Sequence, residues 1–244
     1  MQKILSYILT PIYLFWFGFL LLLFHPIQVI CRKLGGYPTR KKSVDVLNFM
    51  LLYGLGIMGS RIRFKGFDKL PKDRSLIIVS NHQSTFDIPP IVWGFRKHHP
   101  RFISKIELGK GIPSISYNLR HAGSALIDRK NKGQAVKEII RVGRMIEKAQ
   151  HAVSIFPEGT RSKNGKVKNF QEGGIHTLMK VAPTAMIVPF VIDGNNRLMK
   201  NGYYPLQFGT RINFTVLDPI DPKGLSAKEI AEKCEALIKA ELGQ

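Results

Sequence analysis

The feature that most constrains this chain is an apolar stretch near its beginning, Ile4 to Phe24, which holds 21 residues without a charge. As an α-helix it would be roughly 31 Å long, enough to cross the hydrocarbon core of a bilayer. A core helix of a soluble protein seldom carries so long an uncharged run. No small-x-small cleavage site follows Phe24, so we expect the segment to be retained rather than removed as a signal peptide.

A second apolar stretch, Val46 to Met58, has 13 residues and would be roughly 20 Å long as a helix, too short to span. Five basic residues lie between the two stretches: Arg32, Lys33, Arg40, Lys41 and Lys42. A single span would let these charges share the cytoplasmic side with the rest of the basic chain. Alternatively, both helices enter one leaflet as a hairpin, with the basic loop against lipid phosphates.

Two residues favour the hairpin. Trp16 lies in the middle of the first stretch and not at an end, where the aromatic residues of a spanning helix gather, and Pro11 would bend the helix before it. We therefore expect residues 1–60 to form a membrane-embedded two-helix motif at the cytoplasmic face, and residues 61–244 to form an α/β domain. A single amino-terminal span remains the alternative.

Charge points to negatively charged partners. Thirty-seven Lys and Arg residues against 17 Asp and Glu give a formal net charge of +20, which suits anionic lipids, phosphorylated substrates, acidic proteins or nucleic acid. The long apolar stretch argues against nucleic acid as the partner, because a nucleic-acid-binding protein does not need such a segment. Cys31 and Cys234 lie far apart without metal-binding spacing, so neither a disulfide framework nor a zinc site is expected.

Strand and helix patterns alternate after residue 60, which predicts an α/β domain with a mixed central sheet flanked by helices. The predicted strands are residues 61–67, 75–80, 101–105, 124–129, 151–156, 184–192 and 211–217. A helix is predicted over residues 133–149, and a capping box of Ser226 with Glu229 opens a final amphipathic helix. Lys137, Arg141, Arg144 and Lys148 form a stripe on the 133–149 helix, either a solvated face or a docking site for an acidic partner.

The segment NHQSTFD, residues 81–87, places a histidine and an aspartate directly behind a predicted buried strand. Residues five apart on a helix point about 140° away from each other, so His82 and Asp87 meet only if His82 lies on the loop and a helix starts near Ser84. The carboxylate would then orient the imidazole and stabilise its protonated form. Ser84 is a weakly supported nucleophile, because a helix N-cap explains it equally well.

A second segment, FPEGTRS at residues 156–162, follows another predicted strand and brings together an acid, a glycine and an arginine. This composition suits a turn at the end of a strand that holds an anion.

Together these segments resemble the glycerolipid acyltransferases, specifically the 1-acyl-sn-glycerol-3-phosphate (lysophosphatidate) acyltransferases. NHQSTFD matches the N-H-x(4)-D block of that family, and GSALIDR (123–129), FPEGTRS (156–162) and IVPF (187–190) match its later blocks, over roughly residues 60 to 195. Lys105, Glu107 and Leu108 match a K-x-E-L stretch between the first two blocks. Leu126 and Phe190 depart from the pattern and affect the expected shape of the pocket.

The resemblance implies transfer of an acyl group from a thioester to the 2-hydroxyl of lysophosphatidate, which forms phosphatidate in phospholipid biosynthesis. Glycerol-3-phosphate or another lysophospholipid is the alternative acceptor. Acyl-CoA or an acylated acyl carrier protein would be the donor, with no further cofactor and no metal. The +20 charge suits either donor, because both are anionic.

His82 paired with Asp87 would act as the general base, since an alcohol is a poor nucleophile at neutral pH. The thioester is already activated, so we expect direct attack and no acyl-enzyme. Within the matched blocks we place the following residues at the substrate: Asn81, Ser84, Lys105, Arg129, Glu158, Gly159, Thr160 and Arg161.

Individual roles are expected within that set. Lys105, Arg129 and Arg161 are candidates for the acceptor phosphate. Glu158 either binds a glycerol hydroxyl or orients Arg161, and Gly159 lets the backbone approach the substrate and offers an N–H to the oxyanion.

Overall fold

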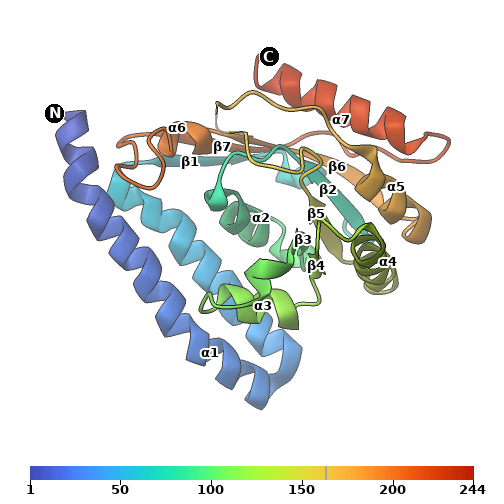
Figure 1. Ribbon diagram of the computed structural model, residues 1–244, viewed down its shortest axis with the longest axis horizontal. Coiled ribbons are helices and arrows are strands. Elements are labelled where there is room, and N and C mark those ends of the chain that lie inside the picture. The colour runs from blue at the N-terminus through green and yellow to red at the C-terminus, as the bar shows by residue number, and fades with distance from the viewer. Residues whose placement is uncertain (163) are drawn as a thin grey trace.

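The computed structural model describes residues 1–162 and 164–244. Over these residues seven strands form one mixed sheet in the order β1-β7-β6-β2-β5-β3-β4, with β6 and β7 antiparallel and the other neighbours parallel (Figure 1). The strands are β1 (Arg61–Lys65), β2 (Leu76–Ser80), β3 (Arg101–Lys105), β4 (Ala125–Ile127), β5 (Ala152–Ile155), β6 (Met186–Asp193) and β7 (Arg211–Val216). The predicted α/β class is confirmed, and each strand overlaps its predicted range.

Helices cover both faces of the sheet (Figure 1). One face packs against α4 (Lys132–Ala149), α5 (Glu172–Val181) and α7 (Ala227–Glu241), and the other against α1 (Gln2–Tyr53), α2 (Ile88–Gly94) and α3 (Ile115–His121). A short helix, α6 (Asn195–Leu198), follows β6. Every residue of β2 is buried, which explains its uninterrupted apolar run, since a strand covered on both faces needs no polar side.

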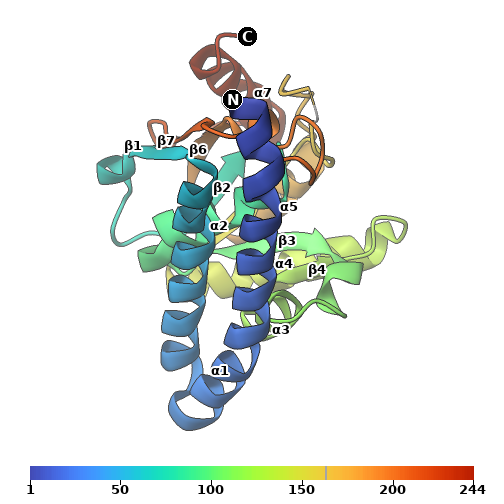
Figure 2. The same cartoon turned by 90° about the vertical axis from the view of Figure 1, so that its left-hand side faces the viewer.

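The amino-terminal segment forms two antiparallel helices within α1 (Figure 2). The chain reverses at Gly36, where φ is 65° and ψ is −150°, a conformation that side chains with a Cβ rarely adopt. The Tyr13 hydroxyl donates to the Leu51 carbonyl at 3.4 Å, and Trp16 Nε1 donates to the Met50 carbonyl at 3.5 Å. The two helices therefore form the expected hairpin, which a 3₁₀ turn, Gly54–Met58, joins to β1.

The hairpin lies along the domain over much of its length. The N–H of Leu206 donates to Thr10 Oγ1 at 2.9 Å, and Ser114 Oγ donates to the Leu21 carbonyl at 2.8 Å. Tyr13 and Leu52 belong to the same buried cluster as the sheet residues on that face. The two-helix motif thus shares its core with the domain that follows it.

One face of the first helix stays uncovered. Its exposed side chains recur at helical spacing and are large and apolar: Ile4, Ile8, Ile12, Phe15, Phe19 and Leu22. Within α1 and the following turn, Gln2–Met58, an 18-residue window has a mean hydropathy of 2.0, long and apolar enough to cross a membrane by length and composition. We call these six residues the apolar stripe.

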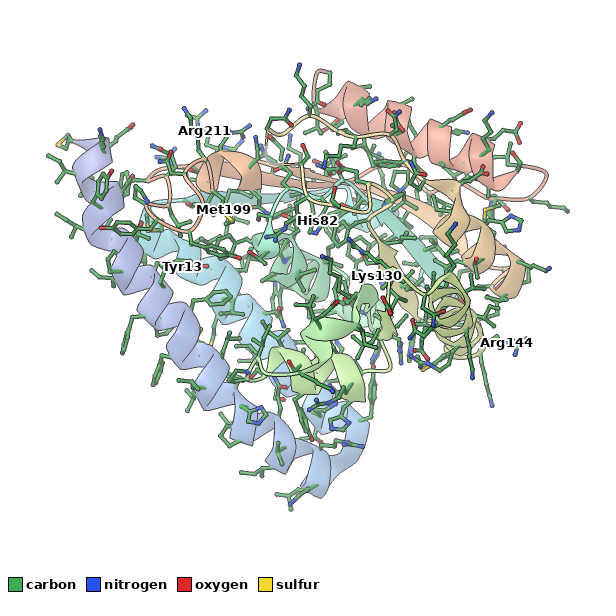
Figure 3. The ribbon with its side chains drawn as sticks, in the orientation of Figure 1. Tyr13, His82, Lys130, Arg144, Met199 and Arg211 are labelled. Carbon is green, nitrogen blue, oxygen red and sulfur yellow. The ribbon has the colours of Figure 1, made fainter. Side chains whose placement is uncertain are left out.

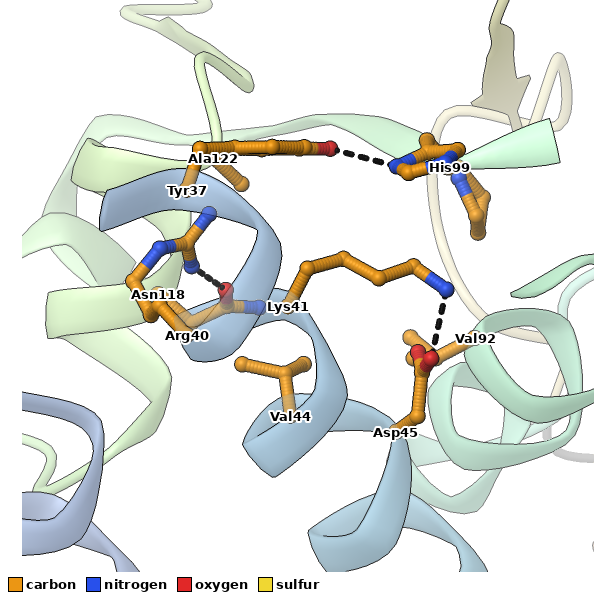
Figure 4. Close-up of a pocket in the computed structure, with 10 residues that line it drawn as sticks. Tyr37, Arg40, Lys41, Val44, Asp45, Val92, His99, Asn118 and Ala122 are labelled. Atoms are coloured by element: carbon orange, nitrogen blue, oxygen red, sulfur yellow. Dashed lines mark hydrogen bonds and ion pairs between the residues drawn. The ribbon is translucent and has the colours of Figure 1, made fainter. Parts of the chain in front are cut away.

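Two of the basic residues expected to face lipid do not do so. Arg40 is 2% exposed and donates to Asn118 Oδ1 at 2.6 Å, and Lys41 pairs with Asp45 at 2.5 Å (Figure 4). The prediction that they lie against lipid phosphates is wrong, because the second helix begins directly after Gly36 and turns both side chains toward the domain. Arg32, Lys33 and Lys42 are exposed.

A small cavity of about 20 Å³ lies at this junction between hairpin and domain (Figure 4). The Tyr37 hydroxyl and His99 Nδ1 share a hydrogen bond of 2.9 Å across it. His99 stacks on His151 with ring centroids 4.4 Å apart, and burial, followed by nearby cations, lowers the pKa of each histidine to about 4. The junction therefore contains two imidazoles that are neutral near pH 7.

Candidate active site

The predicted site residues lie at the carboxyl ends of neighbouring parallel strands. His82 follows β2, the segment 156–162 follows β5, Lys105 ends β3 and Arg129 follows β4. Because β2, β5, β3 and β4 are adjacent and parallel, these ends meet at one edge of the sheet, where open α/β folds bind ligands. In Figure 3, His82 lies near the centre of the molecule, between Tyr13 of the hairpin and Lys130 beyond β4.

His82 and Asp87 form the expected pair. His82 Nδ1 donates to Asp87 Oδ2 at 2.8 Å, and the imidazole side chain is 19% exposed whereas the carboxylate is fully buried. The contact leaves Nε2 as the second ring nitrogen, and among the described residues it makes no hydrogen bond. An imidazole held through Nδ1 with Nε2 open can accept a proton from a bound hydroxyl group.

The turn that carries Asp87 is built as a helix cap. Ser84 caps a 3₁₀ turn, Thr85–Asp87, that continues into α2, and its Oγ accepts from the Phe86 N–H at 3.0 Å. Asp87 Oδ2 accepts the N–H groups of Gln83 at 2.6 Å and Ser84 at 2.9 Å. The N-cap interpretation of Ser84 therefore fits the structure, and its buried hydroxyl has its hydrogen bonds inside the turn.

A residue far along the chain fixes the other oxygen of Asp87. Asn195 Nδ2 donates to Asp87 Oδ1 at 2.7 Å, and Asn195 is fully buried at the start of α6. Sequence reasoning missed this contact. Its one signal is the position of Asn195 directly after β6, which lies next to β2 in the sheet.

The segment after β5 holds the backbone of His82. Glu158 Oε1 accepts the His82 N–H at 2.6 Å, and the Ser162 N–H donates to the His82 carbonyl at 2.7 Å. The ring of Phe156 stacks on the imidazole with centroids 4.1 Å apart. The histidine is thus fixed through its backbone, its ring face and its Nδ1.

Glu158 interacts with backbone groups on both sides. Its second oxygen, Oε2, accepts the Lys168 N–H at 3.1 Å, and the residue is buried. Burial raises the pKa of Glu158, and the hydrogen bonds from the backbone of His82 and Lys168 oppose that rise. Because both oxygens already bind backbone N–H groups, we interpret Glu158 as a residue that positions His82. This role differs from the two that the sequence suggested, binding of a glycerol hydroxyl and orientation of Arg161.

Gly159 adopts φ of 69°, a conformation that residues with a Cβ rarely adopt, and this explains the glycine. Crowding is not the reason, because a Cβ at that position would meet no neighbour. Its N–H donates to the Phe156 carbonyl at 3.0 Å and so closes the turn. This N–H is engaged within the loop, so the geometry gives its expected contact with an oxyanion no support.

Asn81 also has a structural contact. Its side-chain amide donates to the Ile192 carbonyl and accepts the Ile192 N–H, both at 2.8 Å, and the residue is buried. This paired contact ties the end of β2 to β6. The geometry gives Asn81 a positioning role and leaves its predicted contact with substrate without support.

Cations gather at the exposed side of the same edge. Lys105, Arg129 and Arg161 are exposed, as is the uncharged Thr160. Lys168 Nζ donates to Thr160 Oγ1 at 2.8 Å and to the Arg161 carbonyl at 3.1 Å, which adds a cation that sequence reasoning missed. Exposed basic side chains at the ends of neighbouring strands suit a phosphate-bearing substrate.

The model of the Acyltransferase family matches residues 61–193, more than half of the chain. The chain belongs to the acyltransferase family. The match covers β1 to β6 and therefore includes every residue of the candidate site except Asn195.

Relatives of this acyltransferase carry consistent names. The 1-acyl-sn-glycerol-3-phosphate acyltransferase alpha of Mus musculus is 26% identical over 215 residues, covering 88% of this chain and 72% of the relative. The 1-acyl-sn-glycerol-3-phosphate acyltransferase of Cocos nucifera is 32% identical over 140 residues, covering 57% and 44%. The crystal structure of the 1-acyl-sn-glycerophosphate (LPA) acyltransferase PlsC from Thermotoga maritima superposes with a TM-score of 0.78 at 26% identity, covering 100% of this chain and 97% of the other.

Metal ligands do not cluster in this acyltransferase over residues 1–162 and 164–244, where no group of three or more His, Cys, Asp or Glu side chains could hold an ion. His121 and His176, which the motifs do not include, lie on α3 and α5. The acid–base pair that the geometry offers is His82 with Asp87, joined at 2.8 Å.

Proposed function

We propose that this acyltransferase moves a fatty acyl group from a thioester to the 2-hydroxyl of lysophosphatidate and releases phosphatidate. The observation that carries the proposal is the His82–Asp87 pair, whose Nε2 is open at a sheet edge rimmed by exposed cations. The names of the relatives support lysophosphatidate as the acceptor.

His82 acts as the general base. Nε2 takes the proton of the acceptor hydroxyl as its oxygen attacks the thioester carbonyl, and Asp87 stabilises the imidazolium that forms. The tetrahedral intermediate then expels the thiolate, which accepts the proton from His82. Thiols have a pKa of about 8.5, so this leaving group needs little assistance.

Direct transfer without an acyl-enzyme agrees with the local structure. Ser84, one of two hydroxyl residues between His82 and Asp87, is buried, and its Oγ caps the turn and donates to Asp87 Oδ1 at 3.3 Å. A nucleophile would have to leave those contacts. The thioester is already activated, so a covalent intermediate would add a step without lowering the barrier.

The acceptor phosphate binds among Arg161, Arg129 and Lys105, whose side chains are exposed at the carboxyl ends of three adjacent strands. A guanidinium group can bind two phosphate oxygens at once, which orients the glycerol toward His82. Lys168 braces the Thr160–Arg161 backbone and adds positive charge.

The hairpin holds the enzyme in one leaflet of the membrane, at its cytoplasmic face. The apolar stripe faces outward, while the opposite side of the same helix packs on the domain through Thr10, Tyr13 and Leu21. A single span would have to strip these contacts from the domain. A tag at the amino terminus that is accessible only from the side opposite the domain would contradict this arrangement.

Both acyl-CoA and acyl carrier protein suit the donor role, because each is anionic and the chain carries +20. On α4, Lys137, Arg144 and Lys148 are exposed, whereas Arg141 pairs with Glu138 at 2.8 Å. No further cofactor and no metal is proposed, so a chelator should leave turnover unchanged.

The test is an assay of the purified full chain with lysophosphatidate, glycerol-3-phosphate or a zwitterionic lysophospholipid, each with acyl-CoA and with acylated carrier protein. We expect phosphatidate acylated at position 2, with lysophosphatidate the best acceptor by kcat/KM. Faster acylation of glycerol-3-phosphate, or of the zwitterionic lipid, would replace the proposed acceptor by that alternative.

A further inference from the structure

The loop between α6 and β7, residues 199–210, connects the first helix of α1 to the turn that carries Asp87. On the hairpin side, the N–H of Phe208 donates to Ser6 Oγ at 2.9 Å, next to the equivalent contact between Leu206 and Thr10. On the other side, the Tyr203 hydroxyl and Thr85 Oγ1 share a hydrogen bond of 2.8 Å. One loop thus contacts both the membrane helix and the catalytic turn.

Two neighbouring tyrosines project from this loop. Tyr203 is 51% exposed and Tyr204 is 52% exposed. The ring of Tyr204 meets the edge of the Tyr7 ring at a centroid distance of 5.6 Å, and Tyr7 is itself exposed on α1. Figure 1 shows the loop beside the first turns of α1, where the apolar stripe begins with Ile4 and Ile8.

These three rings extend the apolar stripe sideways from the helix toward the active site. Tyrosine combines an apolar ring with a polar tip and therefore favours the boundary between lipid headgroups and acyl chains. Lys3 and Lys200 flank the rings in sequence and are exposed, which places positive charge where lipid phosphates lie. Because Tyr7, Tyr203 and Tyr204 continue the apolar stripe, we take the bilayer surface as the partner of these three rings.

We propose that Tyr7, Tyr203 and Tyr204 form a second lipid-contacting surface, which seats the turn of His82 and Asp87 at the bilayer through the hydrogen bond between Tyr203 and Thr85. The proposal rests on the proposed function, in which the apolar stripe is the membrane face. It adds that the domain itself touches the lipid boundary beside the site, so that a bilayer-bound acceptor reaches His82 without leaving the interface.

Vesicle partitioning tests the surface directly. The full-length protein is mixed with vesicles of phosphatidylcholine and phosphatidylglycerol, and the bound fraction is measured by flotation. Tyr204→Ser should weaken partitioning about fivefold, the scale expected for moving a half-exposed aromatic ring back into water. Val136→Ser is the matched control, because Val136 is 44% exposed on α4, across the sheet from the hairpin, and should partition as the wild type does.

Turnover tests the link to the active site. With Tyr204→Ser, the loss of kcat/KM on long-chain lysophosphatidate in vesicles should exceed the loss on a short-chain, water-soluble lysophosphatidate by about fivefold. Tyr203→Phe keeps the ring but removes the hydroxyl, so it should partition normally and lose about threefold to fivefold in kcat on both substrates, the scale of one hydrogen bond.

Two results would overturn the proposal. The first is that Tyr204→Ser and Tyr203→Ser both partition into vesicles as the wild type does. The second is that Tyr204→Ser loses the same factor in kcat/KM on the vesicle-bound and on the soluble acceptor. Both rings are half exposed, and a melting temperature for each variant shows that it is folded. Partitioning needs no turnover, so a failure of the proposed acyl transfer would leave the vesicle result interpretable.

Discussion

The substitution Asn195→Leu tests whether the buried amide behind Asp87 holds the catalytic carboxylate in place. Asn195 Nδ2 donates to Asp87 Oδ1 at 2.7 Å, and the other partner of that oxygen is Ser84 Oγ at the longer distance of 3.3 Å. Leucine has nearly the same shape, so the change removes the hydrogen bond and leaves the packing largely intact.

The magnitude follows from the kind of hydrogen bond that is lost. A hydrogen bond to a charged group contributes about 1.5–3 kcal/mol, which corresponds to roughly 10- to 150-fold if the whole loss is expressed in the transition state. Oδ2 keeps its contacts with His82, Gln83 and Ser84, so the carboxylate stays in the turn but can rotate. We therefore expect kcat to fall about tenfold or more.

The assay is steady-state acyl transfer with lysophosphatidate, measured together with a melting curve. The KM for lysophosphatidate should change by less than about twofold, since Asn195 is buried away from the exposed cations. Asn196→Leu is the matched control, because Asn196 meets the catalytic turn through its backbone N–H, which donates to Gln83 Oε1 at 3.1 Å. Wild-type kcat in Asn195→Leu, or an equal loss in Asn196→Leu, would refute the reasoning.

Three further predictions concern Glu158, Arg161 and the two histidines at the junction between hairpin and domain. Glu158→Gln should lower kcat about tenfold in the transfer assay, because an amide cannot accept both N–H groups that Glu158 now binds; an unchanged kcat would contradict its positioning role. Arg161→Ala should raise the KM for lysophosphatidate about tenfold or more while kcat changes less, and a selective loss of kcat would place the phosphate elsewhere. Burial and nearby cations lower the pKa of His99 and His151 to about 4, so the unfolded chain binds more protons than the folded chain between pH 6.5 and 4. The free energy of unfolding should therefore fall by about 3 kcal/mol over that range, a figure already halved because both imidazoles are partly exposed. A melting series against pH measures the fall, and a flat profile would contradict it.

Local patterns in the sequence predicted the strands and the contact between His82 and Asp87. Buried parallel strands such as β2 appear as apolar runs, and the five-residue spacing of His82 and Asp87 requires a loop followed by a helix. The helix lengths of the hairpin were harder to predict, because α1 continues through Pro26 and reverses at Gly36, beyond the end of the apolar stretch.

Contacts between distant segments could not be predicted from one sequence. Asn195 lies 108 positions after Asp87, and they meet because β6 lies beside β2. Arg40 appeared to be a lipid-facing charge until its contact with Asn118, 78 positions away, placed it inside the junction. Such pairings depend on the order of strands and the docking of the hairpin, which composition and spacing do not determine.

The most direct measurement of the central claim is turnover of His82→Ala beside equilibrium binding of lysophosphatidate to the same variant. Without the imidazole that takes the proton from the acceptor hydroxyl, kcat should fall by about two orders of magnitude or more. Binding should persist, because the cations that hold the phosphate remain in place. Full turnover in His82→Ala would contradict the account, and so would a loss confined to lysophosphatidate binding.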